Sequence, residues 1–217
     1  MTLVNDDRAA AGAGDAPATD RPPEARIAGA ARNDAARLAA ALAAAFYNDP
    51  VFRWFSPDDH RRGAMLPDFF DVFADAYLSH GEAYTDDAVS GAALWAAPST
   101  DPLSVEPVYA QRLEAIAGVD APRLFEIVEL LEAHAPQEGH YHLQFLGVRP
   151  EQQGAGLGGA LMAPMLARCD RDGVPAYLEA TSDRNRALYE RHGFVARGAI
   201  PLPDGPALWQ LWRDPLR

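Results

Sequence analysis

Apolar side chains recur at helical spacing in the first part of the chain. Leu38, Leu42 and Phe46 lie four residues apart and predict a helix over 35–47. A second helix is predicted over 59–79, where aromatic side chains share that spacing: Phe69, Phe70, Phe73 and Tyr77. These two helices precede every long apolar run of strand type.

The rest of the chain alternates short apolar runs with helical segments. The runs predict extended segments at 24–28, 82–85, 89–95, 141–148, 176–180, 194–199 and 207–212. Further helices are predicted at 108–117, 122–134, 156–171 and 184–191. A turn at Asp86-Asp87 joins the segments at 82–85 and 89–95 into a hairpin. Helices followed by strands that alternate with helices indicate a mixed α/β sheet in one domain.

The first 22 residues are different in kind. They are mostly Ala, Gly, Asp, Thr and Pro, with almost no large apolar side chain. Such a segment cannot bury enough surface to offset the entropy of ordering it. We therefore expect a disordered tail over 1–22 and a single folded domain over 23–217.

The charge and the cysteine content exclude several kinds of site. The 217 residues carry a formal net charge of −12, and all 19 basic residues are arginine, because the chain contains no lysine. A P-loop lysine, a Schiff-base lysine and general nucleic-acid binding are therefore excluded. The lone Cys169 allows no intramolecular disulfide and no thiolate metal site, so we expect no metal and a reduced, cytoplasmic setting. No apolar run reaches the roughly 18 residues of a membrane span, so we expect no membrane partner.

The most informative stretch is a glycine-rich turn between the predicted strand 141–148 and the predicted helix 156–171. It reads Gln153-Gly154-Ala155-Gly156-Leu157-Gly158. With no side chain at Gly154, Gly156 and Gly158, successive backbone N–H groups can point at one anion, and the helix dipole adds partial positive charge. The turn therefore predicts a phosphate or pyrophosphate site.

Two alternative roles for this turn stay open from the residues alone. Gly154, Gly156 and Gly159 satisfy the dinucleotide pattern G-x-G-x-x-G, and Glu179 follows at roughly the 20-residue distance of a ribose-binding acid. Against a nicotinamide cofactor, residues 149–153 separate the strand from the first glycine, and too little chain follows to complete two nucleotide-binding halves. A glycine-rich connection that binds no ligand is the second alternative.

The turn and its surroundings resemble the GNAT N-acetyltransferase superfamily. Gln153 to Gly158 is similar to the acyl-CoA pyrophosphate loop of that family, Q/R-x-x-G-x-G/A, and Leu146-Gly147-Val148 resembles the strand before it. Residues 176–180 resemble the next strand, and residues 184–194 resemble the segment N-x-x-x-Y-x-x-x-G-F.

The resemblance implies an α/β fold of GNAT type, with a mixed, mostly antiparallel sheet, a splayed central parallel strand pair and flanking helices. It implies transfer of an acetyl group from acetyl-CoA to the primary amine of a small molecule, by direct attack in a ternary complex. Three segments are also similar to the puromycin N-acetyltransferase branch: Phe52-Arg53-Trp54, 77–81 and 178–182. That narrower similarity implies an aminonucleoside or another antibiotic as the acceptor.

The resemblance also implies which residues hold the cofactor. Backbone N–H groups would bind the pyrophosphate: Gln153, Gly154, Ala155, Gly156, Leu157 and Gly158. The pantetheine arm would lie between the strand that holds Leu146, Gly147 and Val148 and the strand at 176–180. A main-chain N–H near Leu146 would polarise the thioester carbonyl and stabilise the oxyanion.

Two residues of the helix at 184–191 have implied roles. Tyr189 matches the family tyrosine that protonates the departing CoA thiolate, and its ordinary pKa of about 10 leaves it protonated at neutral pH. Asn185 lies four residues earlier on the same helix face and would contact the CoA arm. The alternative for Tyr189 is an aromatic ring that only packs above Phe194.

The sequence leaves the general base open. Candidates are Glu179, His142, His140 and Glu82, and deprotonation through water needs none of them. Regular strand alternation predicts one face with His142, Gln144 and Leu146 and the other with Tyr141, Leu143 and Phe145.

For the acceptor pocket we expect His142 and Glu179 together with aromatic side chains. Phe52, Trp54 and Phe55 follow the helix-ending sequence Asn48-Asp49-Pro50 and fall in a predicted break between helices, although core packing is their alternative.

The distribution of charge points the same way. Residues 149–197 are close to neutral, whereas the remainder carries the acidic excess, which favours an anionic CoA in the former and a cationic amine near the latter. A solvated acidic surface is the alternative.

Further functions stay open: an acyl-CoA-binding sensor or interaction module without turnover, an acetyltransferase of peptide or protein amines, and a nucleotide-dependent oxidoreductase. A homodimer also stays open.

Overall fold

The computed structural model describes residues 25–216. Its elements are β1 (Ile27–Gly29), α1 (Ala35–Phe46), α2 (Pro50–Phe55), α3 (Asp59–His80), β2 (Glu82–Asp86), β3 (Gly91–Ala96), α4 (Pro107–Ala117), α5 (Ala121–His134), β4 (Tyr141–Val148), α6 (Leu157–Asp172), β5 (Ala176–Ala180), α7 (Asp183–Arg191), β6 (Val195–Pro201) and β7 (Ala207–Arg213). The predicted helices and strands are all present, with ends shifted by a few residues. The tail predicted over 1–22 lies outside the described residues.

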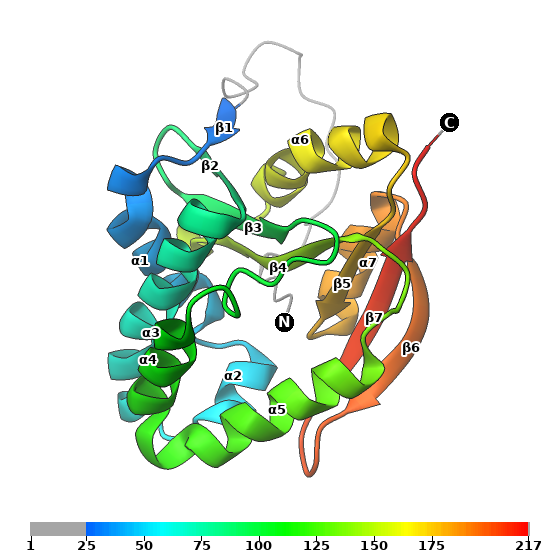
Figure 1. The fold of residues 1–217 in the computed structure, drawn as a ribbon. Coiled ribbons are helices and arrows are strands. Elements are labelled where there is room, and N and C mark those ends of the chain that lie inside the picture. The colour runs from blue at the N-terminus through cyan, green and yellow to red at the C-terminus, as the bar shows by residue number, and fades with distance from the viewer. Residues whose placement is uncertain (1–24, 217) are drawn as a thin grey trace, which may run out of the picture.

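The strands of residues 25–216 form one seven-stranded sheet in the order β1-β2-β3-β4-β5-β7-β6. Every neighbouring pair is antiparallel except β4 and β5. These two parallel strands pair only at Tyr141 with Ala176 and at His142 with Tyr177, and they separate beyond that point (Figure 1). The mixed, mostly antiparallel sheet and its splayed central pair are therefore confirmed.

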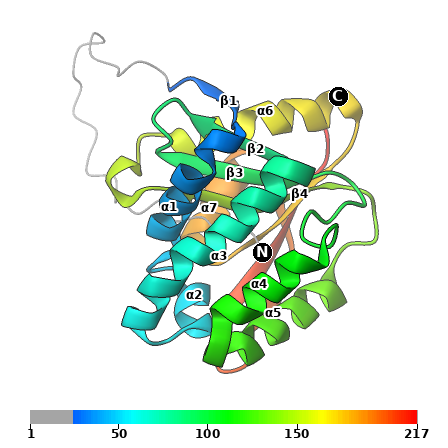
Figure 2. The same ribbon diagram turned by 60° about the vertical axis from the view of Figure 1, so that its left-hand side comes forward.

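Helices cover both faces of the sheet (Figure 2). On one face, α1 to α5 enclose an aromatic cluster in which the ring of Phe145 from β4 lies 5.1 Å from Phe70 and 4.7 Å from Phe73. On the other face, α6 and α7 pack Leu161 and Tyr189 against the strands. Because both faces are covered by apolar packing, the gap between β4 and β5 is framed by rigid elements.

Residues 50–55 form the short helix α2, so the predicted break between helices is wrong. Pro50 occupies the first turn, and the Asp49 carboxylate accepts hydrogen bonds from the N–H groups of Val51 at 2.8 Å and Phe52 at 3.3 Å. Proline needs no N–H partner at that position, and an aspartate before it is a favoured helix cap. The same three residues that end α1 thus start a new helix.

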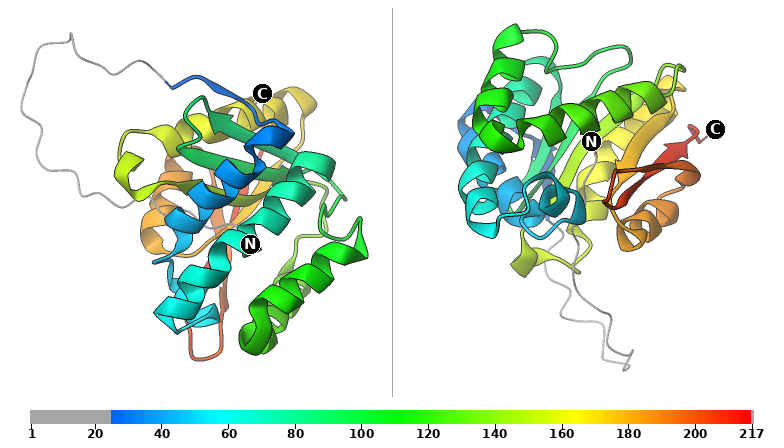
Figure 3. Two further views of the ribbon diagram at one scale, coloured as in Figure 1. Left: turned by 90° about the vertical axis from the view of Figure 1, so that its left-hand side faces the viewer. Right: turned by 90° about the horizontal axis from the view of Figure 1, so that it is seen from below.

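Helix α5 spans from the helical layer to the β6–β7 hairpin (Figures 1 and 3). Gln210 of β7 donates from Nε2 to the carbonyl of His134 at the end of α5, over 2.8 Å. The end of α5 therefore lies against β7. Among residues 25–216, no helix has both the length and the apolar character that a membrane crossing requires.

Candidate active site

A β-bulge in β4 sets which side chains face the gap. Leu94 of β3 pairs with Phe145 and Trp95 pairs with Leu143, so Gln144 has no opposite residue. An extra residue of this kind shifts the alternation of all later side chains. Gln144 and Phe145 consequently share a face, and Leu146 turns to the opposite face, into the cluster with α6. The predicted grouping of His142, Gln144 and Leu146 on one face is therefore wrong.

The backbone of β4 after the bulge directs N–H groups into the gap. Arg149 donates its N–H to the carbonyl of Ser90 beside β3, over 2.8 Å. Backbone groups alternate between the two edges of a strand, so the N–H groups of Leu146 and Val148 point to the opposite edge, where β5 has separated. The carbonyl of Val148 faces the same edge and accepts from Nε2 of Gln153 at 2.9 Å. The structure thus places the predicted Leu146 N–H at the open edge.

The glycine turn enters α6 through left-handed backbone. Gly154 and Gly156 have φ values of 80° and 84°, and Gly156 is the residue that caps α6. A Cβ on Gly156 would meet nothing within 4 Å, so there is room for a side chain at this position. Glycine is favoured there because its backbone is left-handed, a conformation that other residues adopt only with strain. Gly158 differs, because a Cβ there would make an ordinary 3.6 Å contact with Leu188. The first N–H groups of a helix have no partner within the helix, and those of α6 follow this turn directly.

Gly147 serves packing on the other side of the same strand. A Cβ at this position would lie 2.9 Å from Leu42 and 3.0 Å from both Ala45 and Phe46. The missing side chain therefore lets α1 approach β4 closely.

A groove of about 680 Å³ runs between the glycine turn and α7. The residues that line it include Gly154, Gly156, Asn185, Arg184 and Arg191. Its charged side chains are the two arginines, so the groove suits a ligand with several negative charges. The structure brings together here the predicted turn and the predicted Asn185.

Tyr189 lies one turn after Asn185 on α7 and is fully buried. Its ring packs edge-on against Phe194, with 5.7 Å between the centroids. Within the described part of the chain, its hydroxyl has no hydrogen-bond partner. Burial raises the pKa of the Tyr189 phenol well above its ordinary value, and the negative charges of Asp49 and Glu179 add to this. The hydroxyl is therefore a proton donor without an acceptor, which costs stability unless a ligand supplies one.

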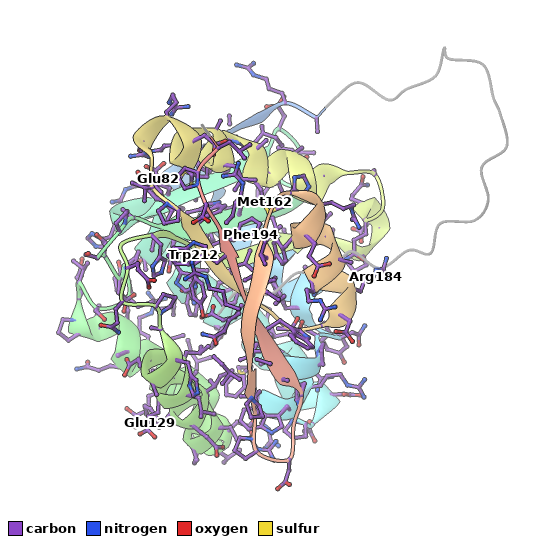
Figure 4. All side chains as sticks on the ribbon, turned by 90° about the vertical axis from the view of Figure 1, so that its right-hand side faces the viewer. Glu82, Glu129, Met162, Arg184, Phe194 and Trp212 are labelled. Atoms are coloured by element: carbon purple, nitrogen blue, oxygen red, sulfur yellow. The ribbon has the colours of Figure 1, made fainter. Side chains whose placement is uncertain are left out.

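A second cavity, of about 300 Å³, lies under α5 on the opposite face of β4 and β5. It is lined by apolar, aromatic and acidic side chains, which include Tyr77, Leu131, Asp101, Glu132 and Glu179. A neighbouring cavity of about 320 Å³ shares Asp101, His140 and His142 with it and extends it outward past Glu138. We call the two cavities together the acidic cleft. Figure 4 shows Arg184 on α7 and Glu129 on α5 at opposite sides of the β6–β7 hairpin.

Glu179 and His142, predicted separately, meet in the acidic cleft. Nε2 of His142 lies 3.0 Å from a carboxylate oxygen of Glu179. Burial opposes ionisation of this carboxyl, but the charge and hydrogen bond of His142 and a hydrogen bond from Tyr177 outweigh it and hold its pKa below the usual range. An ionised carboxylate only accepts, so Nε2 carries the proton, and Nδ1 is the basic nitrogen when the imidazole is neutral.

The aromatic residues that were predicted for the acceptor pocket do not line the acidic cleft. Phe52 and Phe55 are in the core, 6.2 Å apart and packed on Phe69, and they line neither the groove nor the acidic cleft. Trp54 donates from Nε1 to the carbonyl of Pro203 at 2.8 Å and so holds the β6–β7 connection. The structure thus gives these three residues packing roles.

The other base candidates divide between the two faces. His140 lines the acidic cleft, and burial lowers its pKa. Glu82 instead forms an ion pair with Arg168 of α6. It therefore lies away from the acidic cleft.

Comparison with known proteins shows the family of the chain. Residues 43–194 match the family model described as "Acetyltransferase (GNAT) family". This chain belongs to the GNAT acetyltransferase family. The match covers the gap between β4 and β5, the glycine turn and Tyr189.

Two relatives show how far this GNAT acetyltransferase resembles known members. A Schizosaccharomyces pombe protein, "Uncharacterized N-acetyltransferase C550.08", is 28% identical over 182 residues, which cover 78% of this chain and 74% of the relative. A crystal structure from Corynebacterium glutamicum, "histone acetyltransferase HPA2 and related acetyltransferase", is 30% identical, has a TM-score of 0.68 and covers 89% of this chain and 97% of its own.

A third comparison shows the fold alone. A polyamine N-acetyltransferase of Drosophila melanogaster, which forms N-acetylagmatine, has a TM-score of 0.60 at 17% identity. It covers 88% of this chain and 100% of its own.

The residues of this GNAT acetyltransferase fit acetyl-CoA. The groove is lined by glycine backbone and two arginines, which suit phosphates. The open edge of β4 offers N–H groups to the pantetheine arm, and the buried Tyr189 hydroxyl lacks an acceptor that a sulfur atom would provide. The orphaned hydroxyl is the most specific of these features. Buried polar groups without partners are rare in folded proteins.

Sequence reasoning did not single out the buried carboxylate of Asp49, which is hydrogen-bonded to Thr181 at the end of β5. It is 1% exposed and accepts a hydrogen bond from the Thr181 hydroxyl at 2.6 Å, besides capping α2. Burial raises the pKa of its carboxyl to about 6, against the hydrogen bonds from Thr181, Val51 and Phe52 that lower it. The sequence signal was present, because Asp-Pro is a helix-starting pair as well as a helix-ending one.

Proposed function

We propose that this GNAT acetyltransferase transfers the acetyl group of acetyl-CoA to the primary amine of a small cationic molecule, by direct attack in a ternary complex. The observation that carries the proposal is the buried Tyr189 hydroxyl without a partner, one helical turn from Asn185 in the groove. A phenol kept protonated at that place suits a leaving group that departs as an anion.

When bound, acetyl-CoA supplies an acetyl thioester, whose carbonyl carbon an amine can attack. The Leu146 N–H faces the open edge of β4 and can donate to a carbonyl oxygen held in the gap. Tyr189 keeps its proton at neutral pH and can donate it to a sulfur anion. Nδ1 of His142, which Glu179 holds in place through Nε2, can take the proton of the amine.

The lining of the acidic cleft supports a cationic acceptor. Asp101, Glu132 and Glu179 contribute carboxylates, and Leu131 and Tyr77 contribute apolar surface. Among the described residues that line the cleft there is no arginine. A small amine with an apolar spacer and a second positive charge is complementary to this lining.

Several narrower expectations belong to this proposal. The similarity to the puromycin N-acetyltransferase branch makes aminonucleosides, and so antibiotic resistance, a hypothesis for the same cleft. A cytoplasmic location, a homodimer and the cofactor roles of the residues from Leu146 to Val148 and from Gln153 to Gly158 also stay predictions.

The first experiment separates binding from turnover. Acetyl-CoA at 100 times its dissociation constant should stabilise the chain by about 2.7 kcal/mol, which corresponds to a rise of roughly 5–10 °C in Tm for a chain of this size. Release of free thiol is then measured with polyamines, agmatine, aminonucleosides, aminoglycosides, amino acids and a peptide amine. Thiol release with a dicationic amine is the expected result.

The outcomes distinguish the alternatives. No rise in Tm with millimolar acetyl-CoA would refute the cofactor, and a rise with NADH in its place would favour the oxidoreductase. A rise in Tm without thiol release from any amine would favour an acyl-CoA sensor. Turnover of the peptide alone would assign the acceptor to protein amines.

A further inference from the structure

Three buried polar side chains connect α2, the end of β5 and the start of α7. Nδ2 of Asn185 lies 3.3 Å from Oγ1 of Thr181, and Oγ1 of Thr181 lies 2.6 Å from Oδ2 of Asp49. Asp49, Thr181 and Asn185 are 1%, 2% and 4% exposed. The other carboxylate oxygen of Asp49 is held by the N–H groups that begin α2. We call these three side chains the relay.

The carboxylate at one end fixes the direction of every hydrogen bond in the relay. An ionised carboxylate only accepts, so the Thr181 hydroxyl must donate to Asp49. A hydroxyl has one hydrogen, so the Thr181 oxygen can only accept from its second partner. Asn185 must therefore turn its NH2 group toward Thr181 and its carbonyl oxygen away from it. The orientation of this amide follows from the chemistry of its partners.

Asn185 is also one of the residues that line the groove between the glycine turn and α7. One hydrogen of the NH2 group is engaged by Thr181, and the carbonyl oxygen lies at the other side of the amide, so this oxygen is the acceptor that Asn185 can offer to a ligand in the groove. The ligand atom that matches it is consequently a donor. Phosphate oxygens do not donate, whereas the amide N–H groups of a pantetheine arm do.

We infer that Asp49 is a positioning residue that, through Thr181, makes Asn185 present a hydrogen-bond acceptor to an amide N–H of the pantetheine arm. The identity of the arm rests on the proposed function, while the direction of the relay rests on the three side chains alone. Asp49 comes from the helical layer above the other face of the sheet, so the relay couples α2 to the site on α7.

The test compares two ligands that share one end. Acetyl-CoA carries the pantetheine arm, and adenosine 3′,5′-bisphosphate carries the nucleotide end without the arm. In Asp49→Asn, the new side chain keeps an oxygen for the helix cap and turns an NH2 group toward Thr181. The Thr181 hydroxyl is then free to donate to Asn185, whose NH2 group would swing into the groove against the N–H of the arm.

We expect titration calorimetry to show a dissociation constant for acetyl-CoA that rises about tenfold in Asp49→Asn, the loss of roughly one hydrogen bond. Thr181→Val removes the middle hydroxyl without changing side-chain size, and it should raise the dissociation constant of acetyl-CoA by a similar factor. The dissociation constant of the bisphosphate should not change in either variant. Thr181→Ser, which keeps the hydroxyl, should restore the affinity for acetyl-CoA.

Thr85→Val provides the matched control. Thr85 is also buried and donates from Oγ1 to the carbonyl of Gly91 at 2.6 Å, but it belongs to β2 and does not line the groove. The variant should lower Tm and leave both dissociation constants unchanged.

Two results would overturn the inference: unchanged acetyl-CoA affinity in both relay variants, or equal loss of both ligands. Wild-type protein that binds no acetyl-CoA would instead refute the proposed function, before any variant is made.

Discussion

The groove and the acidic cleft lie on opposite faces of the same strand gap and are built in different ways. The groove uses main chain and glycine from one continuous turn, with arginines from α7. The acidic cleft uses side chains from α3, α5, β4 and β5 and from the loop that holds Asp101. A short local motif can therefore encode most of the groove. The acidic cleft, in contrast, can be adapted to another acceptor molecule by changes of single side chains. The comparison predicts that variants should separate cofactor binding from acceptor binding.

The largest expected effect is on the buried hydroxyl of Tyr189 on α7. Tyr189→Phe removes the hydroxyl, which is the one polar atom of this buried side chain. That hydroxyl has no hydrogen-bond partner among the described residues. We expect kcat to fall about 100-fold, because general acid catalysis contributes on that order, while the dissociation constant of acetyl-CoA stays near the wild-type value. Removal of an unsatisfied buried hydroxyl should also raise Tm by a few degrees. Steady-state kinetics, calorimetry and thermal unfolding measure the three quantities.

Tyr141→Phe is the matched control for that variant. The Tyr141 hydroxyl is satisfied, since it donates to Asp172 at 2.8 Å on the α6 side. The control should lower Tm and keep kcat. A Tyr189→Phe enzyme with unchanged turnover would show that its ring only packs on Phe194.

The second prediction concerns the backbone of the groove. Gly156 has a φ of 84°, so Gly156→Ala should lower the free energy of unfolding by about 1–2 kcal/mol. It should also raise the dissociation constant of acetyl-CoA up to about tenfold. Gly158→Ala should leave stability and affinity close to wild type, because its Cβ would make only a 3.6 Å contact with Leu188. Equal effects of the two alanines on acetyl-CoA binding would contradict the assignment of different roles to the two glycines.

The third prediction separates the two regions by charge. Arg191→Gln should raise the dissociation constant of acetyl-CoA roughly fivefold and leave the KM of a dicationic amine unchanged. Glu132→Gln should have the opposite pattern, with a KM for the amine that rises roughly threefold. A neutral-tailed aromatic amine serves as the control acceptor, since it has no second charge for Glu132 to attract. If each variant changed both constants equally, the charge separation would have no functional role.

The contrast between the regions also explains how far the sequence could predict the site. The strand before the glycine turn and the helix with Asn185 and Tyr189 have clear local patterns, so both elements were predicted correctly from the sequence. The grouping of side chains on β4 was wrong, because the bulge at Gln144 depends on pairing with β3, which no local pattern reveals.

The aromatic residues of α2 show a second limit of sequence reasoning. Phe52 and Phe55 have the composition of a binding pocket as well as that of a core, and only their tertiary packing distinguishes the two. The meeting of His142 and Glu179 likewise depends on the parallel pairing of two strands.

The smallest expected effect is a change of stability with pH at Asp49, which Thr181 links to Asn185 of the groove. Burial raises the pKa of its carboxyl from 3.8 to about 6, so the folded state holds the proton more tightly than the unfolded state does. The stability that this provides is complete below pH 4 and is lost as the pH rises through 6. Asn cannot ionise, so the Tm of Asp49→Asn minus that of wild type should become more positive, by a few degrees, between pH 4 and 7.

Asp170→Asn should show the opposite trend in the same thermal scans. Arg213 donates to both carboxylate oxygens of Asp170, at 2.8 and 2.9 Å, and these hydrogen bonds lower its pKa. Its stabilisation is present above the unfolded pKa of 3.8 and is lost as the pH falls below that value, so the Tm of this variant minus that of wild type becomes more negative as the pH rises to about 4 and then stays constant to pH 7. A curve for Asp49→Asn that follows the curve for Asp170→Asn would mean that the folded state lowers the pKa of Asp49 instead of raising it. The relay would then keep its direction down to pH 4, and acetyl-CoA affinity would show no step near pH 6 that depends on Asp49.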